Sequence, residues 1–204
     1  MIQIASGLIR GLSLKSPRSK DTRPTGEKLR QAIFNILRHY RFKDPEENLH
    51  PILEGATVAD IFAGTGAWGI EAASNGAYSV CFVESNGPAI GVLTANLALA
   101  DKAFQSQDLE VEFEIFKRDA AQSYAKLPKV RVMFCDPPYS LGFFEKIVRM
   151  ELSHDRIEIE GLLIFEEAAK TKLDFSELEA AGLVHFDRKD YGDTSVYFFV
   201  KRKK

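Results

Sequence analysis

Short apolar segments alternate with longer mixed segments from residue 58 to residue 201, and this alternation limits the possible folds more than any other feature of the chain. Strands are predicted, in chain order, at 58–62, 79–84, 109–116, 130–135, 161–166, 183–188 and 195–201. Helices are predicted between them at 68–74, 88–100, 120–127, 142–150 and 176–181. Repeated strand–helix units favour a parallel sheet with helices on both faces. The last two strands read as a hairpin around Tyr191-Gly192-Asp193, so we predict an α/β fold with seven strands, mostly parallel and one antiparallel.

The first 43 residues differ from the rest of the chain in charge. They hold ten Lys or Arg residues and two acidic residues, a net charge of +8, whereas the remaining residues carry −10. A surface that binds a polyanion explains this asymmetry better than a face that is merely solvated. We therefore predict a basic N-terminal extension at 1–43 and a main domain at 44–204.

Within the extension, residues 2–14 suit a hairpin or a loop with short strands, and 16–24 suit a loop. Thr25 is expected to cap an amphipathic helix whose apolar residues recur from Leu29 to Tyr40. In that helix Phe34 is expected to pack against other side chains of the protein rather than to stack on a nucleic-acid base. The segment 43–55, with two prolines, is expected to be a connection into the main domain.

The composition is that of an ordinary soluble protein, with 45% apolar and 27% charged residues. No apolar run is long enough to span a bilayer and no signal-peptide layout is present, so a cytoplasmic protein is expected. Cys81 and Cys135 lie in apolar runs and are predicted to be buried strand residues. The four histidines have no ligand spacing, so no metal site is predicted, and a monomer is the default.

A glycine-rich motif from Asp60 to Gly69 follows the first predicted strand of the main domain and opens a helix. Its glycines allow a tight turn and a close approach to a ligand, and Glu84 at the end of the next strand could bind ribose hydroxyls. A nicotinamide oxidoreductase needs the same glycine turn and the same acidic residue after the next strand. Asp60 favours a cofactor with an ammonium group over one with a pyrophosphate, which points to S-adenosylmethionine. Asp119 could bind the adenine amino group or cap the helix that follows it.

The motif Asp136-Pro137-Pro138-Tyr139 is the most specific feature of the chain. It follows the strand predicted at 130–135 and therefore lies at the carboxyl edge of the sheet, where α/β proteins place ligands. The Asp136 carboxylate and the Pro137 carbonyl could each accept a hydrogen of an –NH2 group, and Tyr139 could stack on a base. Two such acceptors stabilise the positive charge that develops on an exocyclic amine when a methyl group is transferred to it. The alternative is a rigid turn without chemistry.

With both motifs placed, the chain resembles class I methyltransferases of the D/N-P-P-Y/F type and, more closely, the RsmD family of bacterial 16S ribosomal RNA guanine-N2 methyltransferases. The resemblance runs nearly from end to end. Its N-terminal part rests on Gly7 to Gly11, Arg23-Pro24-Thr25, Leu29-Arg30 and Phe34-Asn35. Its C-terminal part rests on Asp60 to Gly69, Glu84, Asn96, Asp119 and Asp136 to Tyr139.

The resemblance implies a Rossmann-like class I methyltransferase fold, S-adenosylmethionine as cofactor, and 16S rRNA or the small ribosomal subunit as partner. The predicted catalytic residues are Asp136, Pro137, Pro138 and Tyr139. The predicted cofactor-binding residues are Asp60, Phe62, Gly64, Thr65, Gly66, Glu84, Ser85, Asp119 and Ala120. The predicted substrate-binding residues are Arg10, Arg23, Thr25 and Arg30.

Several alternatives stay open at this point. Methylation of adenine N6 in DNA or RNA needs the same acceptors, and a methyltransferase acting on protein glutamine usually has Asn at position 136. A non-catalytic RNA-binding protein with the same fold is the alternative from another class. Arg30 could simply be solvated, and Glu166 and Glu167 could be surface charge or the rim of a pocket.

Overall fold

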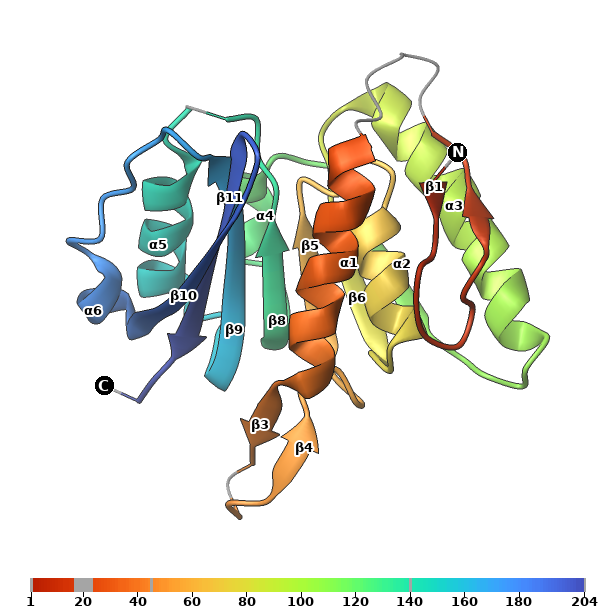
Figure 1. The fold of residues 1–204 in the computed structure, drawn as a ribbon, viewed down its shortest axis with the longest axis horizontal. Coiled ribbons are helices and arrows are strands. Elements are labelled where there is room, and N and C mark those ends of the chain that lie inside the picture. Colours follow the sequence, from red (N-terminus) through yellow and green to blue (C-terminus); the bar gives the residue numbers. More distant parts are fainter. Residues whose placement is uncertain (1, 17–23, 45, 140, 204) are drawn as a thin grey trace.

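The computed structural model describes residues 2–16, 24–44, 46–139 and 141–203. Its centre is a seven-stranded sheet in the order β10-β11-β9-β8-β5-β6-β7 (Figure 1). The strands are β5 (Thr57–Ile61), β6 (Ser79–Val83), β7 (Glu112–Phe116), β8 (Val130–Cys135), β9 (Ile157–Ala168), β10 (Leu183–Tyr191) and β11 (Thr194–Lys201). Because β11 runs antiparallel to both of its neighbours while the other pairs are parallel, the predicted sheet is confirmed.

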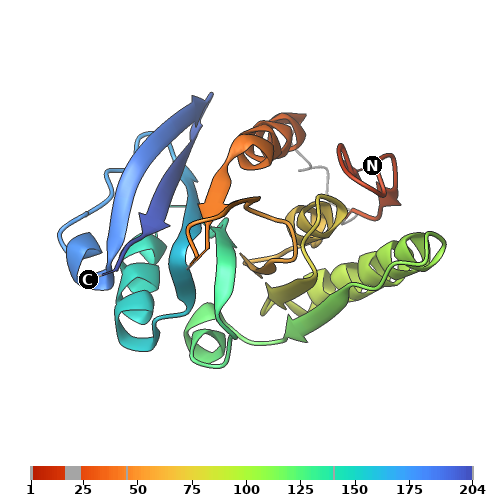
Figure 2. The ribbon, with the colours of Figure 1, turned by 90° about the horizontal axis from the view of Figure 1, so that it is seen from below.

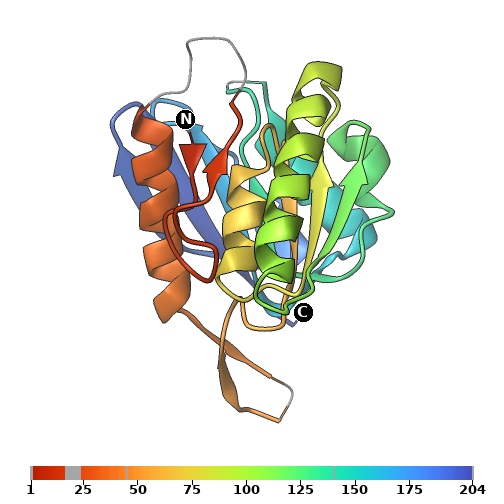
Figure 3. The same cartoon turned by 90° about the vertical axis from the view of Figure 1, so that its right-hand side faces the viewer.

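Helices cover both faces of this sheet (Figure 2). One layer holds α1 (Pro24–His39), α2 (Ala67–Ser74) and α3 (Gly87–Gln105), which lie side by side in Figure 3. The other layer holds α4 (Ala120–Tyr124), α5 (Phe143–His154) and α6 (Leu178–Ala181). Side chains alternate along each strand between the two layers, so that Val58 and Ala59 belong to different core clusters. The predicted burial of Cys81 and Cys135 is confirmed.

All twelve predicted elements of residues 58–201 exist, and their limits shift where charged residues interrupt the apolar pattern. β9 begins at Ile157 rather than at Gly161, and its first four residues alternate apolar with charged side chains, a pattern typical of a half-buried strand that is short here. A register shift in its pairing with β8 and a left-handed Glu160 accommodate this irregular start. Conversely, β7 begins only at Glu112 rather than at Leu109.

The N-terminal strands β1 (Ile2–Gln3) and β2 (Ser13–Leu14) form the expected short hairpin. Its turn packs on the C-terminal end of α2, where Leu8 N donates to the Ser74 carbonyl over 2.7 Å. A Cβ at Gly7 would lie 1.9 Å from that carbonyl oxygen, so only glycine fits there. Most of the loop expected at 16–24 falls outside the described residues.

The expectation that Thr25 caps α1 is wrong, because the helix already begins at Pro24. Proline is favoured at a first helical position, since the missing N–H would have no partner there. The buried residues Leu29, Ile33 and Phe34 bring α1 into the same core as α2 and the sheet. The internal packing expected for Phe34 is confirmed, since its ring lies 5.4 Å from that of Trp68, centroid to centroid.

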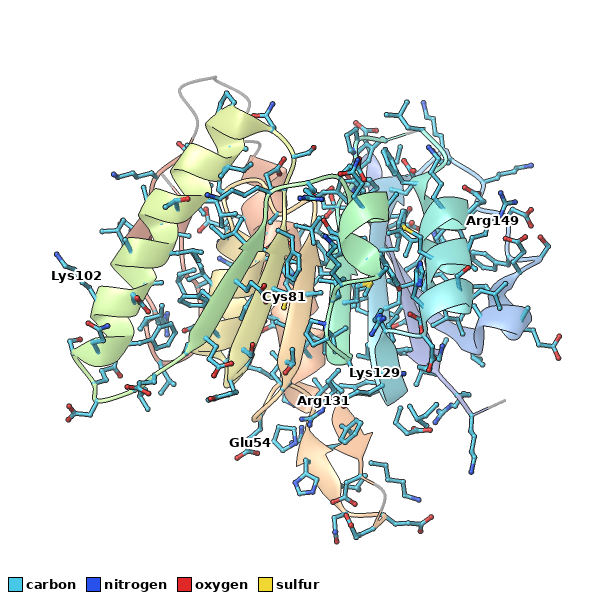
Figure 4. The ribbon with its side chains drawn as sticks, turned by 180° about the vertical axis from the view of Figure 1, so that it is seen from behind. Glu54, Cys81, Lys102, Lys129, Arg131 and Arg149 are labelled. Atoms are coloured by element: carbon cyan, nitrogen blue, oxygen red, sulfur yellow. The ribbon has the colours of Figure 1, made fainter. Side chains whose placement is uncertain are left out.

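The segment 43–55 is more than the connection we expected. β3 (Arg41–Lys43) and β4 (Leu49–Pro51) form a hairpin that projects from one end of the sheet (Figure 1). Arg131 attaches its base, with the guanidinium 4.4 Å from the centre of the Phe42 ring and a 2.9 Å hydrogen bond to the Glu54 carbonyl (Figure 4). Strands of three residues carry too little periodicity to be recognised. The boundary predicted between residues 43 and 44 falls inside this hairpin.

In the described ranges, no helix has both the length and the apolar character needed to cross a membrane.

Candidate active site

Two adjoining cavities open beyond the carboxyl ends of the parallel strands. The first has a volume of about 1010 Å³ and lies over the ends of β6 and β8, next to α4 and α5. The second has a volume of about 790 Å³ and lies between α1, the start of α2 and the β10–β11 turn. Three residues line both cavities: Phe62, Asp136 and Tyr139. The two motifs predicted from the sequence therefore meet at this boundary.

The glycine motif forms a turn with left-handed backbone from the end of β5 into α2. The φ angles are 67° at Phe62, 54° at Gly64 and 76° at Gly66. A Cβ at Gly66 would lie 2.4 Å from Leu93 Cδ1, and one at Gly69 would lie 2.4 Å from Phe82 Cε1. These glycines thus bring α2 close to α3 and β6, in addition to shaping the cavity.

Asp60 is 3% exposed and forms part of the wall of the second cavity. Its Oδ2 atom accepts a 3.0 Å hydrogen bond from Gly69 N in the first turns of α2. Burial raises the pKa of Asp60 to about 7, the Gly69 N–H opposes this rise, and the nearby Glu84 carboxylate adds to it. The side chain therefore both stabilises the turn and offers a titratable carboxyl to the cavity.

Glu84 and Asp119 line the first cavity and are held by backbone N–H groups. Glu84 Oε2 accepts from Gly64 N over 2.8 Å, and Glu84 Oε1 accepts from Ser85 N and Asn86 N over 2.9 and 2.7 Å. Asp119 Oδ1 accepts from Gln122 N over 2.8 Å, so the predicted helix cap is confirmed. Both carboxylates are thus fixed in place at the wall of the cavity.

Asp136 follows β8 directly and stands between the two cavities. Its backbone N–H donates to the Ile61 carbonyl over 3.3 Å, which joins the two motifs across neighbouring strands. Surrounding protein raises the pKa of Asp136 well above its usual value, and the carboxylates of Glu166, Asp60 and Glu167 raise it further, in that order. Asp136 is nevertheless open to the cavities, where a ligand can reach it.

Tyr139 is anchored by its hydroxyl. It donates a 2.6 Å hydrogen bond to Glu166 Oε1 and lies 3.1 Å from Thr194 Oγ1, so that β9 and β11 hold the ring. Partial burial and the Glu166 carboxylate raise the pKa of Tyr139, so the phenol stays neutral at ordinary pH. A fixed aromatic ring is suited to stack on a flat ligand.

Glu166 is the site residue whose role the sequence left undecided. It is 8% exposed and lines the second cavity, so the surface-charge interpretation is wrong and the pocket interpretation is confirmed. Burial raises the pKa of Glu166, opposed by the hydrogen bond from Tyr139. The available signal was a carboxylate near the carboxyl end of an apolar strand, at the same edge of the sheet as Asp136.

The predicted substrate-binding residues do not all reach the cavities. Arg30 lines the second cavity and is buried, with Nε 2.7 Å from Glu71 Oε2 and a 2.6 Å bond to the Gln3 carbonyl, so the solvated alternative is wrong. Arg10 lies in the turn that packs on the far end of α2, away from the glycine motif. The side chain of Thr25 and all of Arg23 fall outside the described part of the chain.

The first cavity is also lined by three cationic residues that the sequence does not predict there: Arg118, Lys146 and Arg149. Lys146 Nζ lies 4.7 Å from the centre of the Phe143 ring, and Arg149 projects from α5 (Figure 4) and pairs with Glu177 over 2.8 Å. They lie outside the basic N-terminal segment, and no local pattern marks them.

With this geometry established, comparisons with known proteins are informative. The family model described as "Conserved hypothetical protein 95" matches residues 2–200. The chain is 28% identical over 206 residues to "Putative rRNA methyltransferase YlbH" of Bacillus subtilis (strain 168), covering 98% of this chain and 100% of that protein. It is 27% identical over 172 residues to "Ribosomal RNA small subunit methyltransferase D" of Escherichia coli (strain K12), covering 84% of this chain and 77% of that protein.

Among solved structures, "Putative methyltransferase yhhF from Escherichia coli" resembles this one with a TM-score of 0.79 at 24% identity. The match covers 100% of this chain and 99% of that chain. A likeness at this identity establishes the fold, which is that of the class I methyltransferases, as predicted.

Proposed function

The chain belongs to the family described as Conserved hypothetical protein 95, and from that premise we propose that it transfers a methyl group from S-adenosylmethionine to the exocyclic N2 amine of a guanine in 16S ribosomal RNA. The observation that carries the proposal is the position of Asp136 and Tyr139, which line both cavities. A cofactor that extends from the first cavity to the glycine turn and a base that enters the second cavity would meet at these residues.

The first cavity suits the nucleoside part of the cofactor. Its volume is that of a small-molecule site, and its walls combine the aromatic rings of Phe62 and Phe143 with the carboxylates of Glu84 and Asp119. Glu84 would bind the ribose hydroxyls and Asp119 the adenine amino group. Ser85 and Ala120 would complete the wall around them.

The amino-acid part of the cofactor would lie at the glycine turn in the second cavity. The backbone of Gly64 and Thr65 lines this cavity, Gly66 shapes the same turn, and the carboxyl of Asp60 suits an ammonium group. When bound, S-adenosylmethionine supplies an electrophilic methyl group on its sulfonium sulfur.

The chain's own residues would prepare the amine. The Asp136 carboxylate and the Pro137 carbonyl each accept one hydrogen of the –NH2 group, which stabilises the positive charge that develops on nitrogen. Pro137 and Pro138 fix the backbone, and the anchored ring of Tyr139 stacks on the base. A base inside a helix cannot reach this position, so the target nucleotide must be unpaired or flipped out.

Two observations support RNA as the substrate. The two relatives carry names that say they act on rRNA, one of them on the small subunit. The segment 1–43 is strongly basic, and its side chains at Arg10, Lys15, Lys28 and Arg38 are exposed, where they can contact phosphates without reading sequence.

The test is a methyl-transfer assay with labelled S-adenosylmethionine and unmodified small-subunit RNA, either naked or assembled into particles. The product nucleoside is identified by mass spectrometry. We expect N2-methylguanosine at a single site. Asp136→Ala should still bind S-adenosylhomocysteine but transfer the methyl group about 100- to 1000-fold more slowly. N6-methyladenosine, or label only in DNA, would keep the chemistry and refute the substrate, whereas no transfer to any nucleic acid would refute the proposal as a whole.

A further inference from the structure

Two carboxylates and one tyrosine line the second cavity together. Asp136 comes from the end of β8, Glu166 comes from β9, and both line the cavity together with Tyr139. Because both acids line the same cavity, one ligand in it can contact both. Of the neighbouring carboxylates, Glu166 raises the pKa of Asp136 most, after burial. A single ligand with two adjacent hydrogen-bond donors would satisfy both.

The Glu166 side chain keeps one oxygen for such a ligand. Its Oε1 atom accepts from the Tyr139 hydroxyl over 2.6 Å, and among the described residues no other group donates to this carboxylate. Oε2 is therefore the acceptor that remains for a molecule in the cavity. An ionised carboxylate only accepts hydrogen bonds, so it selects a donor and disfavours a lone pair.

The bases differ in the donors that they present beside the amine. Guanine carries the N1–H donor next to its 2-amino group, whereas adenine carries the N1 lone pair next to its 6-amino group. A second carboxylate that meets the base at N1, while Asp136 meets the amine, would thus accept the N1–H of guanine. The same carboxylate would repel the lone pair on N1 of adenine. The same amine acceptors serve both bases, so Asp136 alone cannot make this distinction.

We propose that Glu166 determines base specificity by accepting the N1–H of the target guanine, while Asp136 and the Pro137 carbonyl accept the hydrogens of its 2-amino group. This inference rests on the proposed function and adds to it a residue that neither sequence motif contains. Leaving Glu166 unpaired in a buried position is costly, so a base without N1–H is rejected.

The experiment uses the RNA site identified by the methyl-transfer assay, synthesised with guanine or 2-aminopurine at the modified position. 2-Aminopurine keeps the 2-amino group but has a lone pair at N1. For the wild type at pH 8.5, which favours ionised Glu166, we expect kcat/KM to be about 100-fold or more lower for 2-aminopurine than for guanine. Glu166→Gln keeps the acceptor for Tyr139 and gains an N–H donor, so its preference should shrink to less than about tenfold.

Three control variants separate the possible roles. Tyr139→Phe removes the hydrogen bond to Glu166 but keeps the carboxylate, so it should keep the preference for guanine even if it is slower. Glu167→Gln makes the same chemical change at the neighbouring residue, which is not among those lining the second cavity, and should also keep the preference. Glu166→Ala, a second probe in case Glu166→Gln is unstable, should lower kcat/KM for guanine without raising it for 2-aminopurine.

The proposal is overturned if the wild type methylates both bases within tenfold of each other. It is equally overturned if folded Glu166→Gln keeps the wild-type preference for guanine. It is also overturned if Tyr139→Phe loses that preference as fully as Glu166→Gln is expected to, because Glu166 would then act only by positioning Tyr139. In each of these cases methyl transfer to guanine still occurs and the proposed function survives. No transfer to any RNA would overturn both.

Discussion

Two groups in this protein combine acids with a tyrosine and look alike, but they behave in opposite ways. On α5, Glu151 is fully buried and accepts hydrogen bonds from Lys201 Nζ over 2.5 Å, Tyr124 OH over 2.8 Å and Arg156 N over 2.8 Å. Asp136, Glu166 and Asp60 all line the second cavity, and in the described part of the chain no cation pairs with any of the three. We call these the Glu151 network and the Asp136 cluster.

The difference separates a structural role from a functional one. Every charge of the Glu151 network is compensated, which makes it a connection between α5, β11 and the end of α6. The Asp136 cluster carries repulsion between like charges, which destabilises a fold unless a ligand relieves it. Substitutions in the first group should therefore change stability, and substitutions in the second should change function.

The largest effect is expected from Lys201→Ala in the Glu151 network. Removing one partner leaves the buried Glu151 carboxylate without its cation, so the free energy of unfolding should fall by about 3–5 kcal/mol. Urea unfolding followed by circular dichroism measures this. Arg202→Ala, at the exposed next residue, is the control and should change stability by less than about 1 kcal/mol. An equally small effect of Lys201→Ala would remove the contrast between the two groups.

A second effect is expected in the affinity for the cofactor product. Glu84→Ala removes a carboxylate at the wall of the first cavity and should weaken binding of S-adenosylhomocysteine about 10- to 100-fold, as for lost hydrogen bonds to a charged group. Isothermal titration calorimetry gives the dissociation constant. Glu114→Ala on the neighbouring strand is the matched control, and an unchanged constant for Glu84→Ala would place the cofactor elsewhere.

Asp60 and Asp155 should contribute to the free energy of unfolding with opposite dependences on pH. Asp155 pairs with Lys201 in the Glu151 network. The pKa of Asp60 is about 7 in the folded protein and about 3.9 in an unfolded chain, so the folded state binds more protons in this window. Its contribution therefore falls as pH rises from 4 to 7. Lys129 and Lys201 lower the pKa of Asp155 to about 2, so its contribution is present above pH 4 and is lost as pH falls toward 2.

Urea unfolding between pH 3 and pH 8 tests both signs. Asp60→Asn should gain stability relative to the wild type as pH rises, by up to about 1.4 kcal/mol per pH unit. Asp155→Asn should be less stable than the wild type near neutrality, and the difference should close in acid. Parallel curves for the wild type and Asp60→Asn would show that this carboxyl does not titrate in the window.

The smallest effect is expected at Arg10, which lies at the far end of α2 from the cavities. If it contacts a phosphate, Arg10→Ala should weaken the binding of all RNA sequences alike, by less than about tenfold. The slope of the logarithm of the binding constant against the logarithm of the salt concentration should fall by about one. Turnover at saturating RNA should not change. A filter-binding titration across salt concentrations checks this, and a loss of turnover would mean that Arg10 reaches the target nucleotide.

Sequence alone predicts much of this fold because its signals are local. Alternating strands and helices indicate the sheet, and the glycine turn and Asp136-Pro137-Pro138-Tyr139 both follow apolar strands at its carboxyl edge. The resemblance to the RsmD family is confirmed, since the family model spans residues 2–200 and the relatives include Ribosomal RNA small subunit methyltransferase D of Escherichia coli. The short hairpin β3–β4 was missed because strands of three residues leave almost no pattern.

Residues that act through long-range contacts could not be assigned from the sequence. Glu166 joins the site only because β9 lies beside β8 in the sheet, and its partner Tyr139 is 27 positions away. Arg30 looks like another exposed cation of a basic helix until α1 packs against α2 and brings it to Glu71. Such partners depend on strand order and helix packing, which periodicity does not encode.

The most direct test of the account measures stability and catalysis on one sample of Asp136→Ala. We expect single-turnover methyl transfer to fall by about 100- to 1000-fold while the melting temperature stays the same or rises, because an acceptor is lost and a repulsion is relieved. A fall in melting temperature like that of Lys201→Ala, or an unchanged rate of transfer, would contradict the assignment of the Asp136 cluster to function.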